Sequence, residues 1–467
     1  MEKKLSLLFF VLSISFFTFL FGVVVGRFEI FPYQTIREAA LTINTLADAT
    51  LFKVSKGNYV EFSDIAVSDV YANRVKRQTR DDNARPVIMY GGLNQYLDLC
   101  PGYGCLAVFY SAEGKVVKVV PYRPNEIMAK NRVKEYPYED LMFDFSSDVN
   151  PIGIEVYGNG DLLVTFQGEY TFPYGNGIAR IDPDGHPIWF RRDYSHHWPH
   201  LLTDETAMVP AIRIGRAPIK LDGPWRDFGM PCSSRKAMYG VIRHIASDGQ
   251  LLREIAVLEA LLTSPYRAVL QHSTDGCDPI HINFVDVIDD DEGLDGSGLE
   301  KGDIIVSMRN ISAFGVISAK DGKFKKLVRG NFFQQHSVQH YDGARFILFD
   351  NHGADDNGGP SRMLMVDLNT GRERTVFPNK QTEARYRNLF SEQSGHIEVS
   401  KDRKRALVAF SLQGTGIEIG IPGGQVYRVF NNIHDVSSLE NFPELRRENA
   451  AVFILYGVRY TEVLERK

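Results

Sequence analysis

The histidines are the residues of this sequence best suited to chemistry, and they crowd into one part of the chain. All twelve lie at or beyond residue 186 of 467. Three or four imidazoles can hold a metal ion. Alternatively, a neutral imidazole can attack an electrophile while neighbouring cations stabilise the negative charge that develops. The histidines therefore predict either a metal site or a site for nucleophilic and acid–base catalysis.

Several histidines occupy similar positions in short segments of the chain. The segments are YSHHWPHLL with His196, His197 and His200, DPIHINFVDV with His281, QQHSVQHYDG with His336 and His340, FDNHGADD with His352, and SEQSGHIEVS with His396. In four of them a histidine is followed after a few residues by a strand that begins a new unit. We therefore expect these side chains to point at one axis and meet in one cavity. The histidines come from several units of the chain instead of one helix, which favours catalysis over zinc.

One pattern of strands must position these segments, and it recurs through most of the chain. First strands are predicted at 159–166, 205–213, 301–309, 343–350 and 404–411. Second strands with their turns are predicted at 105–120, 178–192, 241–255, 314–328 and 363–377, with a partial sixth at 425–430. Each complete second segment alternates apolar and polar residues around an Asp-Gly, Glu-Gly or Thr-Gly corner, which predicts a β-hairpin.

Six such units predict an all-β fold, a six-bladed β-propeller, preceded by an N-terminal transmembrane helix. Closing the ring removes the free sheet edges that antiparallel repeats otherwise expose. The units recur at a spacing longer than a bare four-stranded blade needs, which predicts loops inserted on one face. A pair of unrelated β-sandwiches is the alternative, but it would not require the same hairpin pattern throughout.

Four motifs follow one another in a fixed order within this repeat region. They read DPIHINFVDV, GDIIVSMRNISAFGVIS, QQHSVQHYDGARFILFDN and SRMLMVDL. From about residue 150 to 430 the chain resembles the bacterial arylsulfotransferase (ASST) family. Its members are six-bladed periplasmic propellers that move a sulfuryl group from an aryl sulfate to a phenol without a nucleotide sulfate donor. The resemblance implies this fold and activity, an aryl sulfate and a phenol as partners, and no cofactor.

The resemblance also implies four catalytic residues. His281 in D-P-I-H-I-N matches the family's His-x-Asn position, and His336 in Q-Q-H-S matches its Gln-His position. Arg309 in V-S-M-R-N matches the arginine of the family's S-x-R strand. His396 is the candidate for the nucleophilic histidine nearer the C-terminus. The family's mechanism uses a transient sulfohistidine, with other histidines and an arginine steadying the sulfuryl oxygens.

Three further residues are expected to bind substrate: His197, Arg362 and Asn283. His197 looks like the histidine that precedes an earlier blade. The family's arginine directly after F-D-N-G is missing, because the loop reads FDNHGADDNGGPSR and offers an arginine only at Arg362. Sulfuryl transfer resembles phosphoryl transfer in having a loose transition state, so the protein mainly positions groups and stabilises charge. Arg309 or Arg362 can grip the sulfonate oxygens in a fork.

The same residues have structural interpretations. His281 and Asn283 can form a hydrogen-bonded pair at a blade entrance, and His336 can cap its strand. Arg309 can form a salt bridge to a neighbouring blade, and His396 can be structural.

Residues elsewhere in the loops have weaker claims on chemistry. Four histidines beside turns or hairpins are expected to be solvated: His186, His244, His272 and His434. Four aromatic residues can sandwich an aromatic ring: Tyr170, Tyr174, Phe332 and Phe333. The two phenylalanines can instead belong to the core. The acidic run 289–298 lacks the spacing of a calcium loop and is predicted to be solvated.

The N-terminus contains a candidate membrane anchor. The run from Leu5 to Gly26 carries no charge, follows Lys3 and Lys4, and is long enough to cross a bilayer. This predicts a single-pass protein of the inner (cytoplasmic) membrane with its ectodomain in the periplasm or outside the cell. Residues 33–53 have helical spacing and predict a stalk or a first helix packed on the domain. The predicted parts are a cytoplasmic tip and anchor at 1–28, a linking segment at 29–60 and a propeller at 61–467.

Export permits disulfides, and the four cysteines can form two. Cys100 and Cys105 bracket the turn CPGYGC, and Cys232 can pair with Cys277. Neither pair has the C-x2-C spacing of a zinc site, so we expect no metal.

The composition of the chain excludes some classes of protein. The chain is 44% apolar and 24% charged with a net charge of −5. This composition excludes disorder and gives nucleic-acid binding little electrostatic support. We predict an arylsulfotransferase-like enzyme. The alternative is a catalytically inactive, membrane-tethered binding or assembly module, and a third interpretation is a metal-dependent hydrolase.

Overall fold

The chain forms two compact units, Met1–Gly57 and Asn58–Lys467. A computed structural model describes residues 13–21, 59–60, 75–77, 83–94, 96–133, 149–168, 172–216, 232, 236–290, 293–351, 359–434 and 451–462. In the first unit residues 13–21 are helical. No helix in the described ranges is long and apolar enough to cross a membrane. The predicted anchor extends beyond the described residues on both sides, and the predicted stalk lies outside them, so the domain boundaries stay predictions.

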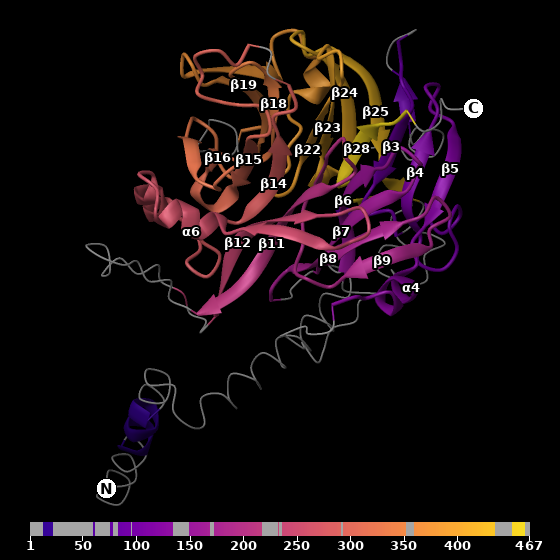
Figure 1. Ribbon diagram of the computed structural model, residues 1–467. Helices are drawn as coiled ribbons and strands as arrows, with labels where there is room; N and C mark the ends of the chain where they lie inside the picture. Colours follow the sequence, from indigo (N-terminus) through magenta and orange to yellow (C-terminus); the bar gives the residue numbers. More distant parts are fainter. Residues whose placement is uncertain are drawn as a thin grey trace, which may run out of the picture. The chain divides into compact units, whose positions relative to one another are not determined.

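Six antiparallel sheets build the second unit (Figure 1). We number these sheets as blades 1 to 6 and give their strands from the innermost outward. Blade 1 contains β28 (Gly457–Tyr460), β3 (Val87–Tyr90), β4 (Cys105–Tyr110) and β5 (Val116–Pro121). Blade 2 contains β6 (Val149–Val156), β7 (Leu162–Gly168), β8 (Gly175–Ile181) and β9 (Pro187–Arg191). Blade 3 contains β10 (His200–Leu201), β11 (Ala207–Arg216), β12 (Lys236–Ile245) and β13 (Leu251–Ile255).

The other three blades follow the same order. Blade 4 contains β14 (Ile282–Val287), β15 (Ile304–Met308), β16 (Ala313–Ile317) and β17 (Phe324–Val328). Blade 5 contains β18 (His336–Asp342), β19 (Arg345–Asp350), β20 (Arg362–Asp367) and β21 (Arg372–Phe377). Blade 6 contains β22 (His396–Val399), β23 (Arg405–Phe410), β24 (Thr415–Gly420), β25 (Val426–Asn431) and β2 (Val75–Arg77).

The blades form a closed ring. Each blade contacts the next through its innermost strands, and the series returns from β22 to β28 and from β3 to β6. Both ends of the unit help to close the ring, because β28 pairs with β3 and β2 pairs with β25. A separate small sheet joins β1 (Tyr59–Val60), β27 (Ala451–Phe453) and β26 (Ile433–His434). The prediction of an all-β, six-bladed propeller is confirmed.

The five complete predicted hairpins form the outer half of blades 1 to 5. Their corners contain Gly114, Gly185, Gly249, Gly322 and Gly371, and each of these glycines has a φ between 66° and 87°. That region is open to glycine and strained for most other residues, which explains the Asp-Gly, Glu-Gly and Thr-Gly corners. Large apolar clusters lie between neighbouring blades, so the core is itself a ring.

Among the described residues of the second unit, the helices are short and lie between strands. The α-helices are α4 (Pro124–Ala129) and α6 (Val257–Leu262). The 3-10 helices are η2 (Arg267–His272), η3 (Arg309–Ile311), η4 (Ala384–Tyr386) and η5 (Ser411–Gln413).

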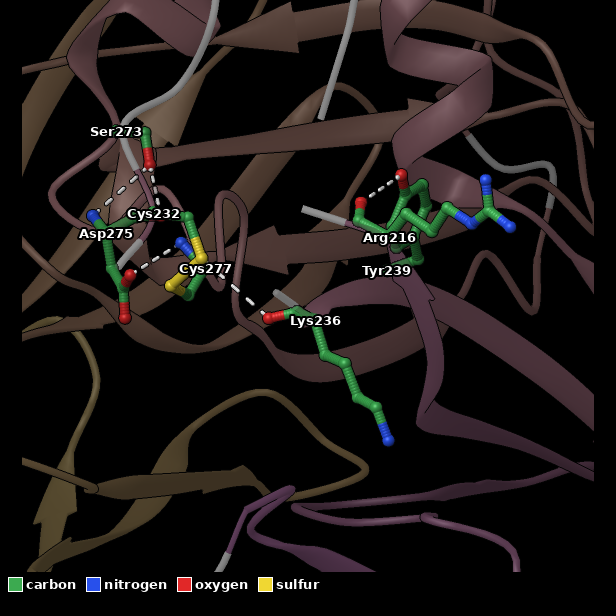
Figure 2. Close-up of a disulfide and its surroundings, with 7 residues drawn as sticks. All are labelled: Arg216, Cys232, Lys236, Tyr239, Ser273, Asp275 and Cys277. Atoms are coloured by element: carbon green, nitrogen blue, oxygen red, sulfur yellow. Dashed lines mark hydrogen bonds between the residues drawn. A yellow bond between two sulfur atoms is a disulfide. The ribbon is translucent and has the colours of Figure 1, made fainter. Parts of the chain in front are cut away.

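Both predicted disulfides are present, Cys100–Cys105 and Cys232–Cys277. The second joins the segment before β12 to the segment before β14 (Figure 2). The Cys277 amide donates to the Asp275 side chain at 2.7 Å, and its carbonyl accepts from the Met238 amide at 2.7 Å. The bridge therefore ties blade 3 to the residues that enter blade 4.

Polar side chains from the innermost strands pair with one another at one end of the channel. His200 contacts Asp286 at 2.8 Å, and Arg459 forms ion pairs with both Glu155 and Glu398. These five residues come from five different blades, and all five are among the residues that line a cavity of about 400 Å³. They link the closing strand β28 electrostatically to its neighbours on both sides.

The pairing of His200 predicts a loss of stability in alkali. Burial alone would lower the pKa of His200, but the Asp286 carboxylate outweighs it and raises the pKa from 6.5 to about 10. The stabilisation is complete below the unfolded pKa of 6.5 and disappears as pH rises through the folded pKa near 10. The urea midpoint should therefore fall between pH 6.5 and 10, and less so in His200→Gln. The exposed His186→Gln serves as control. Equal pH dependence in wild type and His200→Gln would contradict this prediction.

Candidate active site

Three predicted histidines meet where the innermost strands begin. His197 precedes β10, His281 directly precedes β14, and His336 is the first residue of β18. The His197 ring centroid lies 5.1 Å from that of His281 and 6.3 Å from that of His336. Residues from three different blades, far apart in the sequence, thus share one cluster. Three other expected members do not join it, because His200, His340 and His396 line a separate cavity.

Unusual backbone geometry holds two of these histidines. His197 has φ = 51° and His281 has φ = 45°. Both values lie in the left-handed region that residues other than glycine rarely occupy. Each such residue costs roughly 1–3 kcal/mol and persists only where its surroundings impose it. Gly153 on β6 is part of those surroundings, because a Cβ there would lie 2.4 Å from the His197 carbonyl oxygen.

His281 is held by a carboxylate and by the neighbouring loop. Its Nδ1 lies 2.5 Å from Oδ2 of Asp278, which is almost fully buried. The His281 carbonyl accepts from the Arg309 amide at 3.0 Å, and the Asp278 carbonyl accepts from the Asn310 side chain at 2.7 Å. The carboxylate therefore fixes the orientation of the imidazole, and Nε2 of His281 remains available to react.

His336 presents a defined nitrogen. Its Nδ1 faces two acceptors, Oδ1 of Asn351 at 2.7 Å and the Gln334 carbonyl at 3.1 Å. The amide of Asn351 is oriented by its NH2 group, which donates to the carbonyls of Ser391 and Ser394. Nδ1 of His336 therefore carries the proton and Nε2 the lone pair. Burial, aided by Arg309, lowers the pKa of His336 to about 3, so the ring is uncharged at neutral pH.

Arg309 brings the positive charge of the site. Its guanidinium donates to Oδ1 of Asn310 at 3.0 Å and to Oε1 of Gln334 at 2.9 Å. Both acceptors are neutral amides, and no carboxylate of the described chain forms an ion pair with this side chain. Burial lowers the pKa of Arg309, although nearby Asp278 opposes the shift. The site therefore holds a partly buried cation without a paired anion among the described residues.

His196 extends the cluster outward from the channel. Its Nδ1 lies 2.6 Å from Nδ1 of His197, so one proton bridges the two rings. Burial is the main cause of a pKa well below the usual range for both residues, and neighbouring histidines add to it. His196, His197 and His336 are therefore uncharged beside the cationic Arg309.

An aromatic layer separates His396 from the cluster. His396 stacks on Trp198 with centroids 5.5 Å apart and also contacts Phe284 and Tyr90. Trp198 touches His336 on the cluster side, with centroids 6.4 Å apart, and donates from Nε1 to the Tyr90 hydroxyl at 3.2 Å. These side chains are nearly or fully buried, and His396 lines the cavity at the charged end of the channel. The catalytic role of His396 stays a prediction.

Two other predicted site residues form hydrogen bonds to neighbouring strands and loops of the propeller. The guanidinium of Arg362 pairs with buried Asp350 and donates to the Asn331 carbonyl at 2.8 Å. Asn283 is fully buried and donates to the Gln335 carbonyl at 2.8 Å, directly before His336. Their role as substrate ligands stays a prediction.

The aromatic residues and the remaining histidines considered in the sequence analysis lie in different environments. Phe332 belongs to a core cluster, whereas Phe333 is exposed and Tyr174 contacts the cluster. His186 and His272 are exposed, while His244 is half-buried and bonds Thr206. His352, Tyr170 and the His434 side chain lie outside the described part of the chain.

Sequence reasoning missed two residues that hold the cluster, Asp278 and Asn351, which are its hydrogen-bond partners. It placed His196 near the channel but gave that residue no role. Asp278 stands three positions before His281 in the quoted motif, and Asn351 ends the FDN motif, so both were visible as polar residues. No spacing rule links Asn351 to His336 on the neighbouring strand. Within the described residues no group of three or more His, Cys, Asp or Glu side chains is arranged to hold a metal ion.

Comparison with protein families identifies one family that this chain matches. A family model described as Arylsulfotransferase (ASST) matches residues 154–415. Among curated proteins, no match to the chain is found.

Several solved structures match parts of this chain. A protein of unknown function from Bacteroides caccae is 12% identical, with 81% of this chain and 100% of that chain covered and a TM-score of 0.45. A streptogramin B lyase is 14% identical, with coverages of 60% and 67% and a TM-score of 0.31. The WD40 β-propeller domain of Doa1 is 9% identical, with coverages of 69% and 75% and a TM-score of 0.35.

The disulfide next to Asp278 should stabilise the cluster locally as well as the fold. Cys232→Ser with Cys277→Ser opens a link between cysteines 45 residues apart. We expect a loss of about 3–4 kcal/mol in unfolding free energy. Amides of residues 278–282 should exchange hydrogen faster. The matched control, Cys100→Ser with Cys105→Ser, opens a link between cysteines 5 residues apart and should leave those amides unchanged. Equal exchange of residues 278–282 in both double variants would contradict local control by Cys232–Cys277.

Proposed function

The chain belongs to the arylsulfotransferase (ASST) family, and on that basis we propose that it moves a sulfuryl group from an aryl sulfate to a phenolic acceptor through a histidine. The observation that carries the proposal is Arg309. Among the described residues the hydrogen-bond partners of this partly buried guanidinium are amide oxygens, and no carboxylate forms an ion pair with it. Such a group is a site for an anion, since unpaired buried charge is costly. The planar fork of arginine matches the oxygens of a sulfate ester.

His336 is the proposed nucleophile. Its Nε2 carries the lone pair and its ring is uncharged, so it attacks the sulfur of the bound aryl sulfate. The N–S bond forms as the S–O bond to the aryl group breaks, and Nδ1 keeps its proton. In this step His281 carries a proton on each ring nitrogen, with Nδ1 facing Asp278, and gives the Nε2 proton to the leaving phenolate. Arg309 balances the charge of the sulfuryl oxygens throughout.

The second half of the reaction reverses these roles. Neutral His281 takes the proton of the acceptor phenol, whose oxygen attacks the sulfur of N-sulfonated His336. The S–N bond breaks, and its electron pair returns to Nε2 of His336. The products are a new aryl sulfate, neutral His336 and protonated His281, so both residues regain their starting states.

Turnover of a chromogenic aryl sulfate with a phenol acceptor tests the proposal. We expect His336→Ala to lose about 10³-fold or more in rate, because the nucleophile is gone. The exposed His272→Ala should keep the wild-type rate. Mass spectrometry after donor alone should find a sulfonate adduct on the peptide that contains His336. An adduct on another histidine, or activity abolished by a chelator, would contradict this mechanism.

The ion pair of Arg362 favours a second candidate function. The Asp350 carboxylate pairs with the guanidinium of Arg362, the arginine that follows the F-D-N motif in this chain. With Arg362 occupied in this way, a propeller that relies on Arg309 can bind an anion without transferring a group. Sulfate binding without turnover of any aryl sulfate would support such a tethered binding module.

We also propose a membrane-anchored protein with its propeller on the oxidising side. The uncharged run from Leu5 to Gly26 and the preceding lysines support this orientation. The two disulfides agree with it, since disulfides persist in oxidising compartments such as the periplasm.

Cell fractionation tests the anchor. The full chain should stay with the inner membrane after a carbonate wash, and external protease should reach the propeller once the outer barrier is opened. Replacing Leu20 by Asp, within the apolar run, should release the chain from the membrane fraction. Release of the wild-type chain by carbonate would contradict the anchor.

A further inference from the structure

Tyr174 contacts more than one histidine of the cluster. It directly precedes β8, and its ring stacks on His281 with centroids 4.8 Å apart and an interplanar angle of 29°. Its ring also contacts His196 at 5.0 Å and His197 at 5.8 Å, both edge to face. The mechanism proposed above gives this residue no task.

The main chain around Tyr174 allows little movement. The Tyr174 carbonyl accepts from the Gly168 amide at 2.8 Å. A Cβ on the next residue, Gly175, would lie 2.4 Å from the Tyr194 carbonyl oxygen, so the backbones are in close contact there. The ring is therefore presented to the cluster in a fixed position.

The hydroxyl of Tyr174 is buried and forms no hydrogen bond with the described residues. Burial, with the charge of Asp278 and weak hydrogen bonding to it, raises the pKa of this hydroxyl well above its usual range. The contact with Asp278 falls outside hydrogen-bond geometry, so the hydroxyl has no well-formed bond among the described residues. The phenol is thus protonated at neutral pH and available as a donor. A phenylalanine would pack against the same rings without leaving a buried donor unsatisfied.

We propose that Tyr174 is a substrate-binding residue whose hydroxyl donates to an anionic oxygen of the sulfate ester. This inference rests on the proposed function, and it adds a neutral donor to the charge of Arg309. Tyr174 and Arg309 contact the cluster from different blades, blade 2 and blade 4, so an ester bound between them is held from two sides. The unsatisfied donor finds its acceptor only when the anion is bound.

Tyr174→Phe separates this role from packing. The variant keeps the ring and loses only the donor, so its melting temperature without ligand should equal or exceed that of the wild type. Inorganic sulfate, measured by calorimetry, should bind at least about tenfold more weakly, because a hydrogen bond to a charged group is lost. The KM for the aryl sulfate should rise by a similar factor.

The matched control is Tyr341→Phe. Its hydroxyl donates to the Arg403 carbonyl at 2.8 Å, at the charged end of the channel. This variant should melt at a lower temperature and bind sulfate as the wild type does. A lower melting temperature of Tyr174→Phe with unchanged sulfate affinity would overturn the inference and assign the residue to packing.

The outcomes distinguish this inference from the proposed function. Wild-type turnover with an unchanged KM and sulfate affinity in Tyr174→Phe overturns the inference alone. An altered pH profile with unchanged sulfate affinity also overturns it, since the hydroxyl would then serve Asp278. Sulfate binding that weakens in Tyr174→Phe supports the inference even if the wild type turns over no ester. No sulfate binding and no turnover by the wild type overturns both.

Discussion

The pairing of β28 with β3 is the constraint on which the other features depend. It joins the last described strand to the first blade and supplies the innermost strand of that blade. Only a closed ring gives the innermost strands a common axis, and only that axis brings together the histidines of blades 3, 4 and 5. Arg459 on β28 adds a charge contact to blades 2 and 6, so the closing strand is held by hydrogen bonds and by ion pairs.

The site combines uncharged imidazoles with a cation, and burial explains both. Removing a histidine from water favours its neutral form, which is the form with a free lone pair. The same burial makes the guanidinium of Arg309 costly unless an anion arrives. The left-handed backbone of His197 and His281 adds roughly 1–3 kcal/mol of strain at each residue. Gly153, Asp278 and the Cys232–Cys277 bridge are the local contacts that hold this geometry.

Much of the fold was predictable because its signals are local. Glycine at the hairpin corners and alternation along the strands identified the outer hairpin of five blades. The innermost strands were harder to recognise, because β10 has two residues and β14 is buried on both faces.

His281 and His336 were found through short motifs that sit at strand entrances. Other parts of the site depend on distant contacts. Asn351 reaches His336 only because β18 and β19 pair. Tyr174 of blade 2 reaches His281 at the entrance of blade 4, with blade 3 between them in sequence. Arg362 was expected to bind substrate from its place after FDN, and that role stays a prediction. Its pairing with Asp350 on the adjacent strand is a register contact that no motif predicts.

The stacked side chains of Trp198 and His396, with Phe284 and Tyr90, come from four blades and meet across the ring axis. These packed rings separate the histidine cluster from the charged end of the channel. An aryl sulfate that reacts at the cluster as proposed would then have to enter and leave on the same side of this layer, so donor and acceptor would use one entrance in turn.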